Sequence, residues 1–204
     1  SGSLFATITL ALLAFLMVVY STYLTKSGIL GETSVHSFAD GLPGQLIVFL
    51  LFYLFIAFFF LFKNGIHLLK KNEEDAFWSK EFWIFLASLI LVISAFQITL
   101  STSIPVINAL FDTTLAPPSD PIKHYNSWQI PLSILVTLLV AVGQFLKFKK
   151  SDPKKVLKQL APSFILALLF SFLFAYLLSI KAYFLNLLLF TSLFAVLANL
   201  DYLV

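Results

Sequence analysis

The sequence has 204 residues, of which 60% are hydrophobic and only 11% are charged. A soluble domain carries roughly a quarter charged residues, so this chain lacks the polar surface that would cover a fold in water. It contains no cysteine, which excludes disulfides and thiolate metal or redox chemistry in these residues, and its net charge is +3.

Six apolar stretches are long enough to cross the hydrocarbon core of a bilayer, which takes about 20 helical residues. Because backbone groups in lipid must hydrogen-bond internally, runs this long predict α-helices. We therefore predict an all-α fold, a polytopic transmembrane helical bundle that forms one region over residues 1–204. The six stretches are residues 4–24, 46–62, 82–110, 130–146, 160–180 and 183–199.

None of the six stretches contains Asp, Glu, Lys or His. Ionisable groups inside the membrane usually mark ion paths or proton relays, so their absence argues against an ion pump or a secondary transporter. Any chemistry in this segment is therefore expected in the outward connections or at their membrane boundary.

The third stretch, residues 82–110, is longer than a span requires, and Pro105 is expected to bend it toward its outer end. Polar side chains gather just before this proline. They satisfy the backbone carbonyls freed by the bend and pack against neighbouring helices, or they line a cavity or ligand site. These residues are Gln97, Thr99, Ser101, Thr102 and Ser103.

Lysines are unevenly distributed among the connections between the stretches. If the stretches alternate in direction, residues 63–81 and 147–159 share one side, and they hold ten of the 13 lysines. The positive-inside rule makes this side cytoplasmic, which places residues 25–45 and 111–129 in the periplasm or outside the cell. The basic runs are interpreted as topology signals and lipid-headgroup contacts, and nucleic-acid binding is not expected.

The three histidines all lie in connections. His67 is expected to be a solvated or headgroup-level side chain of the lysine-rich inner connection. His124 stands among aromatic residues before the fourth stretch, in an aromatic interface belt or a ligand pocket. His36 lies in the first outward connection and is flanked by Val35 and Phe38. It is either a plain loop histidine or a ligand for a metal or haem iron.

The first outward connection reads T-K-S-G-I-L-G-E-T-S-V-H-S-F-A from residue 25. This resembles a characteristic stretch of CcmF-type cytochrome c haem lyases, approximately T-x-L-[VT]-R-S-G-[VI]-L-x-S-V-H-A-F-A. Weaker similarities follow in the same order, at residues 79–81, 100–105 and 125–126. The positions that fit the first pattern are Thr22, Leu24, Ser27, Gly28, Leu30, Ser34, Val35, His36, Phe38 and Ala39.

The resemblance implies a membrane protein of the inner (cytoplasmic) membrane that handles b-type haem in transit and attaches it to apocytochrome c on the outer face. The implied partners are a haem carrier protein and thiol-handling assembly subunits. It makes His36 an axial haem ligand, its only metal role, with Lys26, Gly28, Val35 and Phe38 as the surroundings of the haem. His124 is a weaker candidate, and no residue is assigned as catalytic.

Departures from the family pattern set limits on this implication. The tryptophan-rich segment, the partner external histidine and two membrane histidines of the family are missing, and Lys26 stands where the family has Arg. We therefore expect this chain to be the middle of a larger lyase and to be inactive by itself. The alternative is a non-catalytic membrane subunit or permease segment that scaffolds partner proteins.

Overall fold

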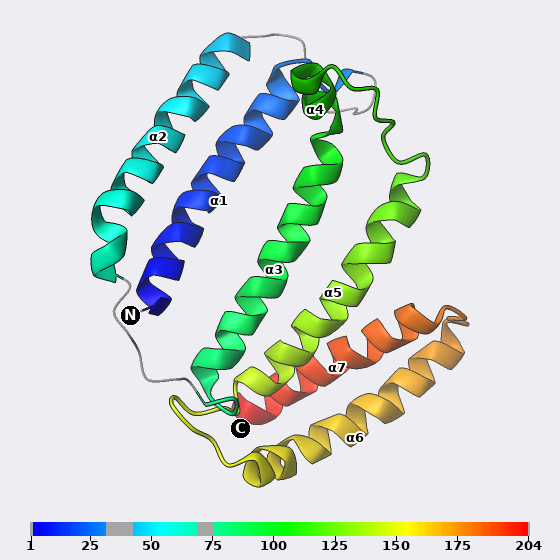
Figure 1. Cartoon of the computed structure of the whole chain (residues 1–204). Coiled ribbons are helices and arrows are strands. Elements are labelled where there is room, and N and C mark those ends of the chain that lie inside the picture. The colour runs from blue at the N-terminus through cyan, green and yellow to red at the C-terminus, as the bar shows by residue number, and fades with distance from the viewer. Residues whose placement is uncertain (1, 32–42, 69–75, 204) are drawn as a thin grey trace. The chain divides into compact units, whose positions relative to one another are not determined.

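The computed structural model describes residues 2–31, 43–68 and 76–203, and these residues form seven α-helices without any strand. Six of the helices are long and apolar enough to cross a membrane. The prediction of an all-α fold with six spans is confirmed. The helices are α1 Gly2–Lys26, α2 Pro43–Leu68, α3 Lys80–Thr102, α4 Ile104–Phe111, α5 Pro121–Gly143, α6 Pro153–Leu177 and α7 Tyr183–Leu203 (Figure 1).

The surfaces of the long helices are apolar. In α2, for example, Phe52, Phe55 and Phe62 are 57%, 68% and 77% exposed. A helix that is apolar on all sides cannot be stable at the surface of a soluble protein, because such a surface would expose far more apolar area to water than monomers tolerate. The chain is therefore an integral membrane protein whose outer faces lie against lipid.

The chain divides into two compact units, and α3 passes from one to the other. Unit 1 comprises Ser1–Glu73 and Ser101–Pro117, and unit 2 comprises Glu74–Leu100 and Pro118–Val204. In unit 1, α1 and α2 lie side by side as an antiparallel pair (Figure 1). Gly65 brings α2 close to α1, because a Cβ atom there would lie 3.2 Å from the Phe5 ring.

In unit 2, α7 packs against both α5 and α6. Three alanines, Ala141, Ala167 and Ala198, are fully buried and let the helices approach closely. The hydroxyl groups of Thr137 and Thr191 also meet at 2.9 Å across α5 and α7. Small side chains and polar contacts such as this one thus help to hold these helices together where lipid supplies little hydrophobic driving force.

We expect Ala198→Leu to destabilise unit 2 by about 1–3 kcal/mol, because the added carbon atoms have no space in a close-packed core. Val196 is 57% exposed, so Val196→Leu on the same helix is the matched control and should change the stability little. Unfolding of the purified chain in mixed micelles, followed by circular dichroism, measures both. Equal stability of the Ala198→Leu variant and the unsubstituted chain would contradict this packing of α7.

The predicted third stretch is divided in the structure. The helix α3 ends at Thr102, and Ser103 separates it from α4, which carries Pro105 in its first turn. The bend that the sequence predicts therefore lies at Ser103, before the proline, because proline fits the first turn of a helix but not its interior. At 23 residues, α3 alone is about 35 Å long, which suffices to cross a bilayer.

Two helices begin earlier than their apolar stretches do. Before α5, the carboxylate of Asp120 accepts a hydrogen bond from the Lys123 N–H at 2.9 Å, and before α6, Asp152 accepts one from the Lys154 N–H at 3.0 Å. In both cases a proline follows the aspartate at the first helical position. The Asp-Pro pairs act as helix starts, so residues 121–129 and 153–159 are helical rather than parts of loops.

Candidate functional site

The first outward connection leaves α1 through a tight turn. Gly28 has φ +73°, a left-handed conformation that glycine adopts without strain, and its carbonyl oxygen accepts a hydrogen bond from the Gly31 N–H at 2.9 Å. Lys26, the last residue of α1, is exposed. His36, Val35 and Phe38 lie outside the described residues, so their predicted role as a haem ligand and its surroundings stays a prediction.

The end of α1 is tied to the break between α3 and α4. The Tyr20 hydroxyl lies 2.6 Å from the Ser103 hydroxyl, and Ser103 is buried. The ring of Tyr20 also stacks on that of Tyr23 at 6.4 Å between centroids. These contacts anchor the helix turn from which the Gly28 turn departs.

A polar cluster joins α3 to α5 inside unit 2. The Gln129 Nε2 group donates to Gln97 Oε1 at 2.7 Å, and the Ser94 hydroxyl donates to Gln129 Oε1. Gln129 Nε2 also lies 3.4 Å from the carbonyl oxygen of Ser94, and Gln97 Nε2 lies 3.3 Å from His124 Nε2. We call these four half-buried residues, Ser94, Gln97, His124 and Gln129, the amide cluster.

The backbone carbonyl of Ser94 fixes the direction of the hydrogen bonds in the amide cluster, because a carbonyl oxygen can only accept. Gln129 therefore turns its NH₂ group toward Ser94 and Gln97, and the oxygen of Gln97 accepts. The NH₂ group of Gln97 is then left to donate to His124 Nε2. A neutral imidazole that accepts at Nε2 carries its proton on Nδ1, so the cluster selects this tautomer.

Two of the polar residues predicted before Pro105 make defined contacts in the structure. Gln97 reaches across to α5, and the Thr99 hydroxyl donates to the Ala95 carbonyl of its own helix at 2.8 Å. Gln97 thus joins two helices, whereas Thr99 bonds within its own helix; a role of these residues in lining a cavity or ligand site stays a prediction. Ser94 and Gln129 were missed from the sequence, although a glutamine at the edge of an apolar stretch is a signal for such a contact.

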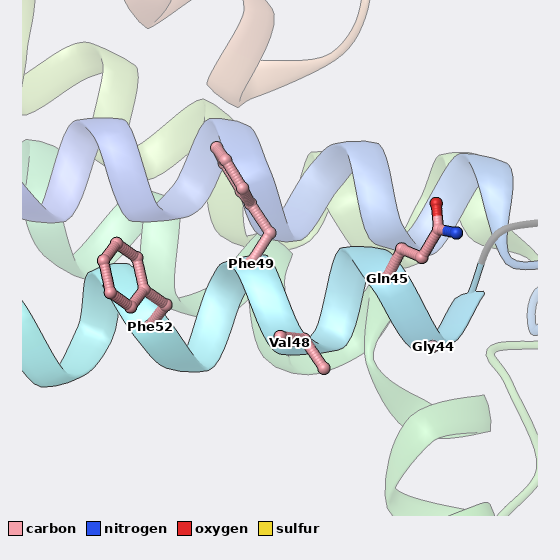
Figure 2. A pocket seen from close by; sticks show the side chains of 5 residues that line it. All are labelled: Gly44, Gln45, Val48, Phe49 and Phe52. Carbon is pink, nitrogen blue, oxygen red and sulfur yellow. The ribbon is translucent and has the colours of Figure 1, made fainter.

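His124 is the one predicted haem-ligand candidate whose side chain the structure describes. His124 Nε2 faces the Gln97 amide, and no cluster of three His, Cys, Asp or Glu side chains able to hold a metal occurs in the described part of the chain. One surface hollow of about 440 Å³ lies along α2, beside Gly44, Gln45, Val48, Phe49 and Phe52 (Figure 2). Among the described residues, its lining is apolar apart from Gln45.

A second hollow, of about 250 Å³, lies between α6 and α7 in unit 2. It is lined by aromatic and aliphatic side chains together with Ser171 and Asn186. The Asn186 amide donates to the Ile180 carbonyl at 3.0 Å, and the Ser171 hydroxyl donates to the Leu168 carbonyl at 2.9 Å. The Asn186 amide thus ties the start of α7 to the turn before it, and the Ser171 hydroxyl bonds within the interior of α6.

The fold and its contacts define a polytopic α-helical membrane protein with six spans. The chain is similar to the cytochrome c-type biogenesis protein CcmF of Pseudomonas fluorescens, with 33% identity over 161 residues that cover 76% of this chain and 23% of the relative. CcmF of Escherichia coli K12 is 27% identical over 86% of this chain and 27% of its own length. The cytochrome c-type biogenesis protein ccl1 of Rhodobacter capsulatus is 28% identical over 79% of this chain and 24% of its own length.

The resemblance to CcmF-type proteins is therefore confirmed for most of this chain. The chain spans about a quarter of the length of the curated relatives that it matches. No protein-family model matches the sequence, and no solved structure matches it.

Proposed function

We propose that this chain is part of a membrane haem lyase, which handles haem and attaches it to apocytochrome c on the outer face of the inner membrane. The observation that carries the proposal is the similarity to proteins of cytochrome c-type biogenesis over 76–86% of the chain. A haem carrier protein and thiol-handling assembly subunits are the partners that this role requires.

Within this function, we assign axial ligation of the haem iron to His36. Two features support the assignment. The loop that contains His36 follows the Gly28 turn directly after a spanning helix, and Lys26 adds an exposed positive charge where the loop begins. In addition, the amide cluster turns His124 Nε2 toward Gln97, which leaves His124 poorly suited to bind iron. Haem bound there would bring its vinyl groups to the thiolates of the substrate, while the protein orients both.

The proposal is tested with the full-length haem lyase that contains this chain, called the full-length parent. It is expressed in a strain from which the corresponding gene has been deleted. The parent is expected to restore the yield of c-type cytochrome and to be purified with haem. Normal cytochrome c yield from a parent that never binds haem would instead favour the scaffolding role.

The lysine distribution supports a topology with the connections 63–81 and 147–159 in the cytoplasm and 25–45 and 111–129 outside. In unit 2, the end of the connection 63–81 contacts the start of the connection 147–159: the Lys80 N–H donates to the Lys147 carbonyl at 2.9 Å. Alternating spans are consistent with this contact, and ten of the 13 lysines then lie on one side.

Cysteine labelling tests the topology without background, because the sequence has no cysteine. We expect a membrane-impermeant maleimide to label Thr114→Cys in intact cells, and to label Lys155→Cys only after the membrane is opened. Both positions are exposed, so access to the side chain is not limited by the fold. The reverse labelling pattern would overturn the assignment of sides.

A further inference from the structure

Two connections of unit 2 are fastened to each other at one end of the helices. The Ser151 N–H donates to the Trp78 carbonyl at 2.7 Å, and the Lys80 N–H donates to the Lys147 carbonyl at 2.9 Å. The Lys149 N–H donates to Glu81 Oε2, also at 2.9 Å. We call residues 78–81 and 147–151 the clasp.

Buried serines make the clasp a fixed structure rather than a loose pair of loops. Ser79 is fully buried and its hydroxyl accepts from the Phe82 N–H, while the buried Ser151 hydroxyl accepts from the Lys147 N–H at 2.7 Å. Lys149 has φ +65°, an unfavourable conformation for lysine, at the point where Glu81 binds its N–H. These hydrogen bonds fix the backbone that carries the lysine side chains of the clasp.

Six exposed lysines surround the clasp and the start of α6. The acidic groups beside them are bound to the backbone: Glu81 accepts from the Lys149 N–H and Asp152 from the Lys154 N–H. Among the described residues, no ion pair joins these lysines to an acidic side chain. The acidic residues 73–75 lie outside the described residues. The six are Lys147, Lys149, Lys150, Lys154, Lys155 and Lys158.

Aromatic side chains stand among these lysines. Phe77 and Phe148 are 60% and 67% exposed, and the Lys80 ammonium lies 5.7 Å from the centre of the Phe148 ring. The Trp78 and Trp83 rings stack at 6.0 Å, and Trp83 Nε1 donates to the Phe77 carbonyl. Tryptophan and exposed phenylalanine beside lysine at the ends of spanning helices are typical of the headgroup region of a membrane.

We propose that the clasp and the first turns of α6 form a binding surface for anionic phospholipids, in which the six lysines bind phosphate groups and the exposed aromatic rings contact the acyl chains. A soluble acidic protein would satisfy the lysines but leave Phe77 and Phe148 in water. A lipid satisfies both, because one molecule carries a phosphate group for the lysines and acyl chains for the rings.

The tryptophans of the chain supply the probe for this surface. Only three occur, and Trp78 and Trp83 lie at the clasp, so a Trp128→Phe background confines the fluorescence to it. The purified chain is placed in nanodiscs of phosphatidylcholine that contain increasing fractions of brominated phosphatidylglycerol or, in parallel, brominated phosphatidylcholine. We expect the phosphatidylglycerol to quench at a markedly lower fraction than the phosphatidylcholine.

The variant Lys147→Gln/Lys149→Gln/Lys150→Gln should lose this preference by about tenfold, because three charges near the phosphate groups are removed. The matched control is Lys26→Gln/Lys123→Gln/Lys181→Gln, which removes the same charge elsewhere and should keep the preference. If the first variant does not fold, as judged by circular dichroism, Lys154→Gln/Lys155→Gln/Lys158→Gln on the exposed side of α6 takes its place.

Three results would overturn the proposal. The first is equal quenching by the two brominated lipids in the Trp128→Phe background. The second is an equal loss of preference in the clasp variant and in its control. The third is binding of soluble polyglutamate to phosphatidylcholine nanodiscs that depends on the same lysines, without any preference for phosphatidylglycerol, which would indicate an acidic protein partner.

Discussion

Replacing His36, the proposed axial ligand, with alanine in the full-length parent should abolish most of the proposed haem-dependent function. An axial ligand holds the iron directly, and even the loss of a group that only supports a ligand costs about 10–100-fold in metal affinity or activity. We therefore expect the yield of c-type cytochrome to fall about tenfold or more, together with a shift in the absorption spectrum and the redox potential of any haem that remains. Cytochrome yield and the spectrum of the purified parent are the measurements.

The other two histidines of the sequence serve as matched controls for His36→Ala. His67 belongs to the far end of α2, and the His124 ring faces the Gln97 amide. His67→Ala and His124→Ala should each leave the spectrum of the haem unchanged. A spectrum and a cytochrome yield that are normal in His36→Ala would remove His36 from the proposed role, and a spectrum altered by His124→Ala would move that role to His124.

The number and type of the helices could be predicted because the membrane leaves few alternatives for an apolar run of 20 residues. The helix ends were less predictable, because they depend on local groups rather than on hydropathy. The capping carboxylates of Asp120 and Asp152 extend α5 and α6 beyond their apolar stretches. Ser103, rather than Pro105 itself, marks the end of α3.

The sequence predicts those parts of the candidate site that are formed by residues close together in the chain, but not those formed by residues from different helices. The Gly28 turn follows from two glycines after a helix, and its left-handed conformation is what glycine there permits. The amide cluster depends on the register between α3 and α5, which brings Ser94 and Gln97 to Gln129 across 35 and 32 residues of sequence. No periodicity in a single helix specifies such a register, so the partners of Gln97 could not be named from the sequence.

The second large effect concerns Gln129, the centre of the amide cluster. Gln129→Ala removes hydrogen bonds to Gln97 and to Ser94 at once. The loss of a hydrogen-bond partner at half-buried polar groups costs about 1–3 kcal/mol, so the variant should be destabilised by about this amount. Unfolding of the purified chain in mixed micelles measures it. Asn126→Ala, at an exposed position of the same helix, is the control and should have little effect.

The double variant Gln97→Leu/Gln129→Leu separates a specific amide contact from a general effect of α5 packing. Because both partners become apolar, no amide is left unpaired between them, and we expect part of the lost stability to return. The tautomer of His124 gives a second readout, since ¹⁵N NMR of labelled histidine reports which ring nitrogen carries the proton. The unsubstituted chain should show the proton on Nδ1, and this preference should weaken in Gln129→Ala, where the Gln129 NH₂ group no longer fixes the direction of the Gln97 amide. Equal stabilities of Gln129→Ala and the double variant, with an unchanged tautomer, would mean that the amide cluster does not couple α3 to α5.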